Sequence, residues 1–109
     1  MNTTNLTGSE KQIAWATEIR SGYIATVEAA LAWTNSDAYL RYAGSDEFRP
    51  AIVASLTRAL ETLAAATDSR VFIDSRRGGL SKALTGLGWS RDDASQAASD
   101  ATIPGGMRA

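Results

Sequence analysis

Apolar residues recur every three to four positions along two long stretches of this chain, the spacing that places them on one side of an α-helix. In the first stretch, polar residues take most of the opposite side. The two patterns predict long helices over residues 9–33 and 50–67, which we expect to pack antiparallel. The apolar positions are Ile13, Ala16, Ile19, Tyr23, Ile24, Val27, Ala30 and Leu31, then Phe48, Ile52, Val53, Leu56, Ala59, Leu60 and Leu63.

Each long helix has a recognisable start. Ser9 and Gln12 have the spacing of a capping box, in which the serine side chain caps the first turn and the glutamine side chain bonds the cap backbone. Thr7 and Glu10 repeat this spacing two residues earlier and are an alternative start. Pro50 suits a first helical position because the N–H that proline lacks has no partner there.

Shorter helices should cover the open side of the long pair. We expect them near residues 36–42, 69–76 and 80–87. A weak polar helix near residues 91–99 should be peripheral, and residues 1–6 and 101–109 should be loose tails. The whole chain, residues 1–109, is therefore expected to form one compact all-α helical bundle.

The segment 69–76 is open to two interpretations. Val71 and Ile73 alternate with polar residues as in a β-strand. However, a lone strand has nothing to pair with in a chain that is otherwise helical. The favoured interpretation is a short helix capped by Thr67 or Asp68.

Composition excludes more functions than it indicates. The chain has 109 residues, 44% of them apolar, which is enough for one core. Its formal net charge of −1 argues against a general DNA-coating role. It has no Cys and no His, and so lacks thiol chemistry, the commonest general base and the commonest metal ligand. We expect a protein that is not an enzyme and needs no cofactor or metal ion.

The same sequence predicts a cytoplasmic location. Residues 1–5 are polar and uncharged and no apolar run follows them, so they are not a signal peptide. No segment approaches the ~18–20 continuous apolar residues of a membrane span. We expect no membrane partner.

Arg20 lies on the apolar side of the first long helix. A guanidinium there either reaches water or meets an acid. Asp74 follows Phe72 and Ile73 and could accept a bidentate hydrogen bond, so it is the expected partner. A structural ion pair is the preferred interpretation, and a functional site that uses either residue is the alternative.

A glycine-containing turn between residues 70 and 82 carries four cations and one acid, Asp74. The cations are Arg70, Arg76, Arg77 and Lys82. The glycines permit close backbone approach, and a following helix start offers free N–H groups to an anion. An acidic protein partner or a nucleic acid could bind there, although the spacing is not that of a nucleotide P-loop. The simpler alternative is a solvated turn.

Aromatic residues supply a second candidate surface. Tyr39 and Tyr42 are three residues apart on one predicted helix, with Arg41 beside them. Tyr, Trp and Arg dominate interface hot spots. Trp33 and Trp89 are further candidates, although a small core could absorb all four aromatic residues. Trp15 is expected in the core.

The run of residues 6–20, Leu-Thr-Gly-Ser-Glu-Lys-Gln-Ile-Ala-Trp-Ala-Thr-Glu-Ile-Arg, resembles a segment of small proteins from phages and other bacterial mobile elements. In that group an aromatic-Ile-Asp-Asn-Arg motif often follows, and residues 72–76 match it except that Ser75 replaces the asparagine. The resemblance implies a helical segment 69–76, a pairing of Arg20 with Asp74 and a bacterial host cell. It implies no particular activity.

These observations favour a non-enzymatic protein-binding factor that inhibits a host defence complex, as anti-CRISPR proteins do, by covering a surface of a larger protein or ribonucleoprotein complex. The expected contacts are Arg70, Arg76, Arg77 and Lys82, followed by Tyr39, Arg41 and Tyr42. The main alternative is a nucleic-acid-binding accessory module that uses the basic turn. A third is a homodimer formed through apolar surface on the long helices.

Overall fold

A computed structural model describes residues 2–103, and these residues form six α-helices and no β-strand. All twelve helix ends lie within two residues of the predicted ends. The prediction is therefore confirmed for the type and the position of each helix. The helices are α1 (Glu10–Thr34), α2 (Asp37–Ala43), α3 (Arg49–Ala65), α4 (Ser69–Ser75), α5 (Gly79–Gly86) and α6 (Arg91–Asp100). Among the described residues, none of the helices is both long enough and apolar enough to cross a membrane.

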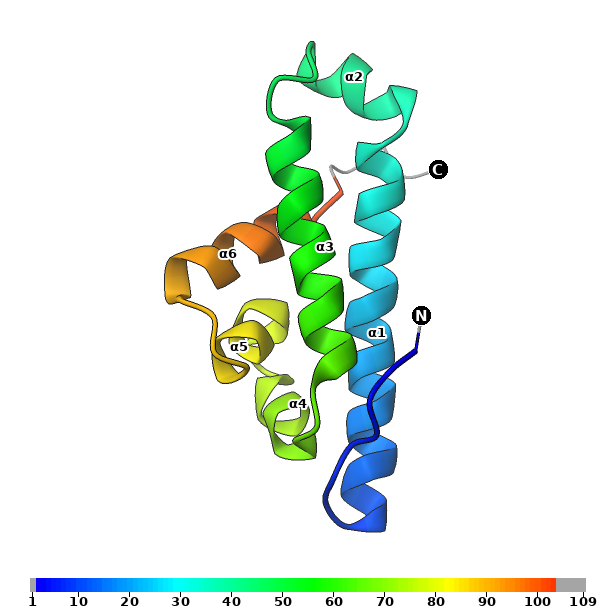
Figure 1. Cartoon of the computed structure of the whole chain (residues 1–109), viewed down its shortest axis with the longest axis vertical. Helices are drawn as coiled ribbons and strands as arrows, with labels where there is room; N and C mark the ends of the chain where they lie inside the picture. The colour runs from blue at the N-terminus through cyan, green and yellow to red at the C-terminus, as the bar shows by residue number, and fades with distance from the viewer. Residues whose placement is uncertain (1, 104–109) are drawn as a thin grey trace.

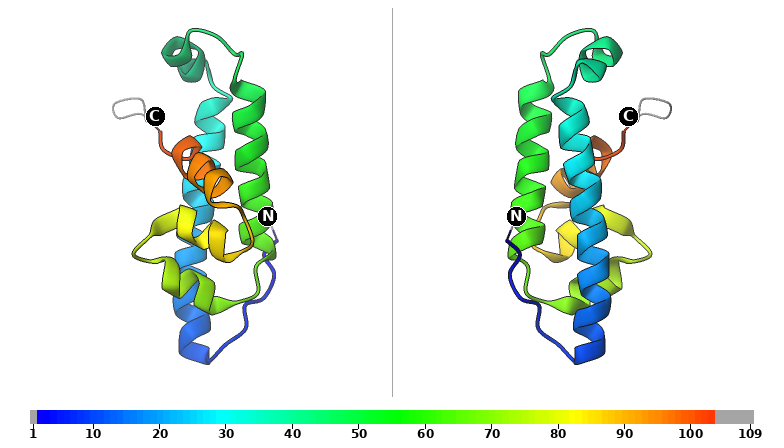
Figure 2. Two further views of the ribbon diagram at one scale, coloured as in Figure 1. Left: turned by 90° about the vertical axis from the view of Figure 1, so that its left-hand side faces the viewer. Right: turned by 90° about the vertical axis from the view of Figure 1, so that its right-hand side faces the viewer.

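The two long helices, α1 and α3, lie side by side and share the most extensive helix–helix contact (Figure 1). Helices α4, α5 and α6 pack on one side of them, as the two turned views also show (Figure 2). Helix α2 lies apart from this group, at the end of the molecule where α1 passes into α3 (Figure 1). The molecule therefore has a packed body, formed by every helix except α2, and a separate end formed by α2.

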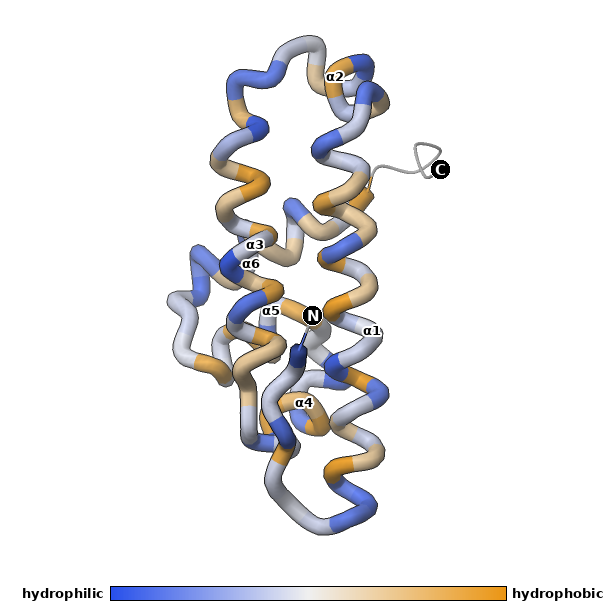
Figure 3. Tube along the Cα trace, turned by 45° about the vertical axis from the view of Figure 1, so that its right-hand side comes forward, coloured by the Kyte–Doolittle hydropathy of each residue, from blue (hydrophilic) through white to orange (hydrophobic). Residues whose placement is uncertain are grey.

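The core lies inside this body. Apolar positions recur along α1 and α3 (Figure 3), and the most deeply buried of them pack against α4, α5 and α6. Phe72 of α4 and Leu84 of α5 are fully buried. Helix α2 contributes no residue to this cluster, and its one buried side chain is Tyr39.

Several parts of the prediction are wrong. By the prediction, helix α2 should cover the open side of the long pair, but it lies at the end of that pair (Figure 1). Helix α6 is not peripheral, because Ala94 and Ala97 are fully buried against the body; these small side chains let a polar helix approach closely. Residues 1–6 are not a loose tail over their described part: Leu6 is buried and the Thr4 N–H donates to the Ala64 carbonyl at 2.7 Å. Carbonyl groups at the end of α3, which have no partner within the helix, hold this segment in place. Of residues 101–109, Ala101 is buried, and residues 104–109 lie outside the described part.

Local signals decide the ambiguous helix starts. The Ser9 hydroxyl accepts from the Gln12 N–H at 3.2 Å, and the Gln12 side chain accepts from the Ser9 N–H at 3.0 Å, which confirms the capping box. The Asp68 carboxylate accepts from the Arg70 N–H at 2.9 Å and caps α4, so segment 69–76 is helical. The strand-like pairing is confined to a single bridge between Thr7 and Asp68 within the described residues.

Candidate interaction surfaces

Arg20 is buried, as its place on the apolar stripe predicts, but its expected partner is wrong. Its Nη1 donates to the Thr4 carbonyl at 2.8 Å and to the Ala66 carbonyl at 3.2 Å, whereas Asp74 is exposed and no ion pair joins it to Arg20. The guanidinium thus ties the N-terminal segment and the end of α3 to α1. Burial lowers the pKa of Arg20, because removal from water disfavours the charged form.

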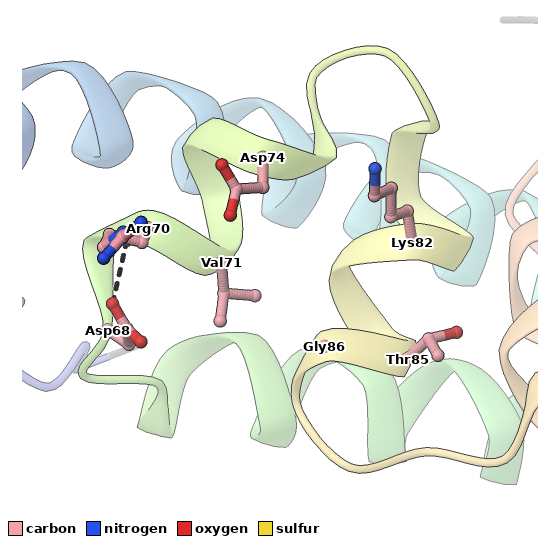
Figure 4. Close-up of a pocket in the computed structure, with 7 residues that line it drawn as sticks. All are labelled: Asp68, Arg70, Val71, Asp74, Lys82, Thr85 and Gly86. Carbon is pink, nitrogen blue, oxygen red and sulfur yellow. Dashed lines mark hydrogen bonds between the residues drawn. The ribbon is translucent and has the colours of Figure 1, made fainter.

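The cations of the predicted basic turn do not share one surface. Arg70 and Lys82 line a cleft of about 490 Å³ between α4 and α5, together with Asp68 and Asp74 (Figure 4). Asp74 and Lys82 project from opposite walls, and no ion pair joins them. The cleft therefore carries two acids beside its two cations and is not a basic patch.

The floor of this cleft is apolar. Val71 and Gly86 lie at its base (Figure 4), and a Cβ atom on Gly86 would stand 3.1 Å from Cγ1 of Val71. Glycine therefore allows α4 and α5 to approach closely here. No buried polar side chain points to a bound ligand, and we assign the cleft no function.

Arg76 lies elsewhere. Its guanidinium stacks over the ring of Trp15 in α1, 4.7 Å from the ring centre. Trp15 is 45% exposed, so its predicted core position is wrong. Arg77 is exposed and does not line the cleft.

Three of the four large apolar side chains that are exposed among the described residues gather at the α2 end. They are Leu40, Tyr42 and Phe48, with exposed fractions of 38%, 58% and 65%. We call these three residues the α2-end patch. Sequence reasoning found Tyr42, but it placed Phe48 in the core and did not consider Leu40. The signal it missed is the polar loop 44–47, which ends at Phe48 and leaves this residue just before the first turn of α3.

A small aromatic cluster, which includes Tyr42 of the patch, lies at the same end of the molecule. Trp33 makes edge contacts with both Tyr39 and Tyr42, at ring distances of 5.7 and 5.8 Å. The Arg49 guanidinium lies over the ring of Tyr39, 5.1 Å from the ring centre. Tyr39 is only 5% exposed, so it offers little surface for the predicted contact, whereas Arg41 is exposed.

Several polar atoms in this cluster are buried without a hydrogen-bond partner. They are Nε1 of Trp33 and Nε and Nη2 of Arg49. Unpaired buried donors are costly, and few occur in native structures. The start of α3 has the same incompleteness, because its cap Phe48 offers no side-chain hydrogen bond and its first turn has no acid.

A groove of about 960 Å³ lies between α1, α2 and the segment after α6, and Trp33, which contacts Tyr42 of the patch, is among its lining residues. Its floor includes Ala25, Ala29 and Ala32, which are spaced along one face of α1, and Trp33 and Arg41 lie at the α2 end. Small side chains on a helix face leave room for another chain to lie close to the backbone. The fourth aromatic candidate, Trp89, is not part of this exposed end. It is buried, with the Arg58 guanidinium 3.8 Å from its ring centre, and its Nε1 donates to the Thr62 hydroxyl at 3.1 Å.

The described residues thus define an all-α domain with a packed body and an exposed aromatic end. No protein-family model, curated protein or solved structure matches this chain. The exposed surfaces of the molecule are therefore what points to its function.

Proposed function

We propose that this chain is a non-enzymatic protein-binding factor and that the α2-end patch is its principal contact surface. One observation carries the proposal: Leu40, Tyr42 and Phe48 are each exposed in α2 or just before α3, whereas Trp15 is the one exposed large apolar side chain in the rest of the described chain. Single exposed apolar residues are ordinary on a protein surface, but a group of them typically marks an interaction site.

The residue types fit such a role. Aromatic side chains and arginine supply most of the binding energy in protein interfaces. Tyr42 packs on Trp33, so its ring is already held in place before a partner arrives. A side chain ordered in advance loses less conformational entropy on binding.

The groove beside the patch extends this surface. Its alanine floor suits a helix or an extended segment from a partner, with the patch as the anchoring end. In the proposed arrangement, α1 and α3 form an antiparallel pair. Helix α2 closes this pair at the end that the partner covers.

The nucleic-acid alternative receives less support. Phosphate binding needs cations that lie along one surface. Here Arg70 and Lys82 share their cleft with two carboxylates, and Arg76 stacks on Trp15. The geometry therefore favours a protein partner over a nucleic acid.

The biological setting of the proposal comes from the resemblance of residues 6–20 to proteins of phages and mobile elements. In this phage or mobile-element setting, we propose that the chain inhibits a host defence complex, in the manner of anti-CRISPR proteins. It would do so by covering a surface of that complex. Such complexes are the first partners to test.

The experiment is affinity capture from bacterial lysates that contain defence complexes, followed by binding measurements on the captured protein. Wild type should retain a specific partner, and Tyr42→Ala with Phe48→Ala should weaken its binding at least about tenfold, as loss of two hot-spot residues does. Trp15→Ala is the matched control, because it removes an exposed aromatic ring far along α1. Equal weakening by both variants, or binding that only Trp15→Ala removes, contradicts the proposal.

A further inference from the structure

One face of α1 is left uncovered by the described residues. Ala25, Ala29 and Ala32 are exposed along it and form part of the floor of the groove of about 960 Å³. Other lining residues come from α2 and from Ala101 and Ile103, which follow α6. Because the floor is made of small apolar side chains, a segment that fills the groove can approach the backbone of α1 closely.

The chain itself leads into this groove. Ala101 is buried, and Ile103, the last described residue, is half-buried and packs against the core. Both residues line the groove, so residues 104–109 begin at its wall. A separate molecule loses translational and rotational freedom when it binds, whereas a tethered segment does not. Short tethers give effective concentrations of about a millimolar, which favours this segment over a free partner.

The segment is long enough to cover the groove. The lining residues of α1 run from Ala25 to Trp33, which is about 12 Å of helix at a rise of about 1.5 Å per residue. The extended chain of residues 104–109 spans about 20 Å. It can therefore follow the groove over its whole length, whichever end Ile103 occupies.

The composition of the segment also suits the groove. Its sequence is Pro-Gly-Gly-Met-Arg-Ala. Gly105 and Gly106 have no side chain, so their backbone can lie directly on the alanine floor. Met107 is flexible and apolar, and methionine sulfur makes favourable contacts with aromatic rings. The ring of Trp33 lines the groove and offers such a contact.

We infer that residues 104–109 occupy this groove in the free protein, with Met107 packed against Trp33 and the α1 alanines. Fixing two glycines costs more conformational entropy than fixing other residues, so the segment is held weakly and can be displaced. Its consequence for binding rests on the proposed function: a partner that enters the groove must first displace the segment. The segment therefore lowers the affinity of that partner.

Disulfide trapping in the full chain tests the location directly. The chain has no Cys, so two introduced cysteines can form a single intramolecular disulfide. Ala32→Cys with Met107→Cys should form it in oxidised glutathione, which takes up both thiol hydrogens as it is reduced. Mass spectrometry measures the loss of two hydrogens from the protein.

Ser99→Cys with Met107→Cys is the matched control. Ser99 is exposed on α6, does not line the groove and is much nearer to Met107 along the chain than Ala32 is. A segment that lay free would reach position 99 at least as often, because shorter loops close more readily. The pair at positions 32 and 107 should form roughly tenfold faster than the control, as docking raises its effective concentration. Equal rates, or a faster control, overturn the inference.

Thiol accessibility gives a second, independent measurement. The single variant Ala32→Cys should react slowly with a maleimide while the segment covers the groove. Adding Met107→Asp should raise the rate about threefold or more, because labelling follows the uncovered fraction. Adding Ser99→Asp instead, a change to the same acid outside the groove, should leave the rate unchanged. No increase with Met107→Asp overturns the inference, and circular dichroism verifies that each variant is folded.

The inference and the proposed function fail separately. If neither trapping nor accessibility shows a covered groove, but Tyr42→Ala with Phe48→Ala still weakens partner binding, the inference is overturned and the proposed function stands. If the groove is covered as expected but no partner is captured, the proposed function alone is overturned. With a captured partner, Met107→Asp should strengthen binding about threefold, since the competent fraction of the protein rises.

Discussion

The same kinds of side chain have different surroundings in the body and at the α2 end of this molecule. In the body Phe72 is fully buried, Trp89 has a hydrogen-bond partner and buried Arg20 donates to two carbonyls. At the α2 end Phe48 is exposed, and the half-buried side chains of Trp33 and Arg49 hold buried nitrogens without hydrogen-bond acceptors. Apart from the Ser69 hydroxyl in α4, the described residues of the body pair their buried polar side-chain atoms internally. The α2 end does not, and this contrast is what indicates association.

The contrast is sharpest for phenylalanine. Phe72→Ala should destabilise the protein by about 3–5 kcal/mol, because it removes a fully buried ring and leaves a cavity. Urea unfolding followed by circular dichroism measures the loss. A cost below about 1 kcal/mol would mean that the body is less tightly packed than described.

Removal of the Arg20 side chain should have the next largest effect. Arg20→Ala should cost about 2 kcal/mol, since it leaves the Thr4 and Ala66 carbonyls without their charged donor. Asp74→Ala should have almost no effect, and the two losses should add in the double variant. A coupling of more than about 0.5 kcal/mol would restore the rejected ion pair.

Loss of a helix cap should lower the free energy of unfolding by a smaller amount. Ser9→Ala should cost about 1 kcal/mol, because the Ser9 hydroxyl accepts the Gln12 N–H at the start of α1. Ser21→Ala, an exposed change inside the same helix, is the control and should be nearly neutral. Equal unfolding free energies for the two variants would show that the cap contributes nothing.

The smallest effect on stability is expected at the α2 end. Phe48→Ala should change the unfolding free energy by no more than about 0.5 kcal/mol, as for other exposed positions. It should nevertheless weaken association. A loss of stability like that of Phe72→Ala would show that Phe48 belongs to the core.

The helices could be predicted from the sequence because their signals are local. The apolar spacing, the Ser9–Gln12 box and Pro50 act within one or two turns, and each predicted helix occurs where expected. The partner of Arg20 could not be predicted, because backbone carbonyls are present at every position. Which of them meets a guanidinium depends on where the N-terminal segment and the end of α3 lie in space.

The candidate surface was only half predictable for a related reason. Residue type marked Tyr42 and Arg41 as interface residues, but exposure decides whether such a residue can serve. Tyr39 and Trp89 are buried, whereas Trp15 and Phe48, which the apolar stripe placed in the core, are exposed. Periodicity shows which side of a helix is apolar, but it does not show whether another element covers that side at a given turn.

Site-specific photo-cross-linking in bacterial cells tests the central claim most directly. A photoreactive amino acid at position 42, within the α2-end patch, is compared with the same amino acid at position 95, an exposed serine of α6. The account predicts discrete protein adducts from position 42 and none from position 95. Adducts of equal yield from both positions, or none from position 42, would contradict it.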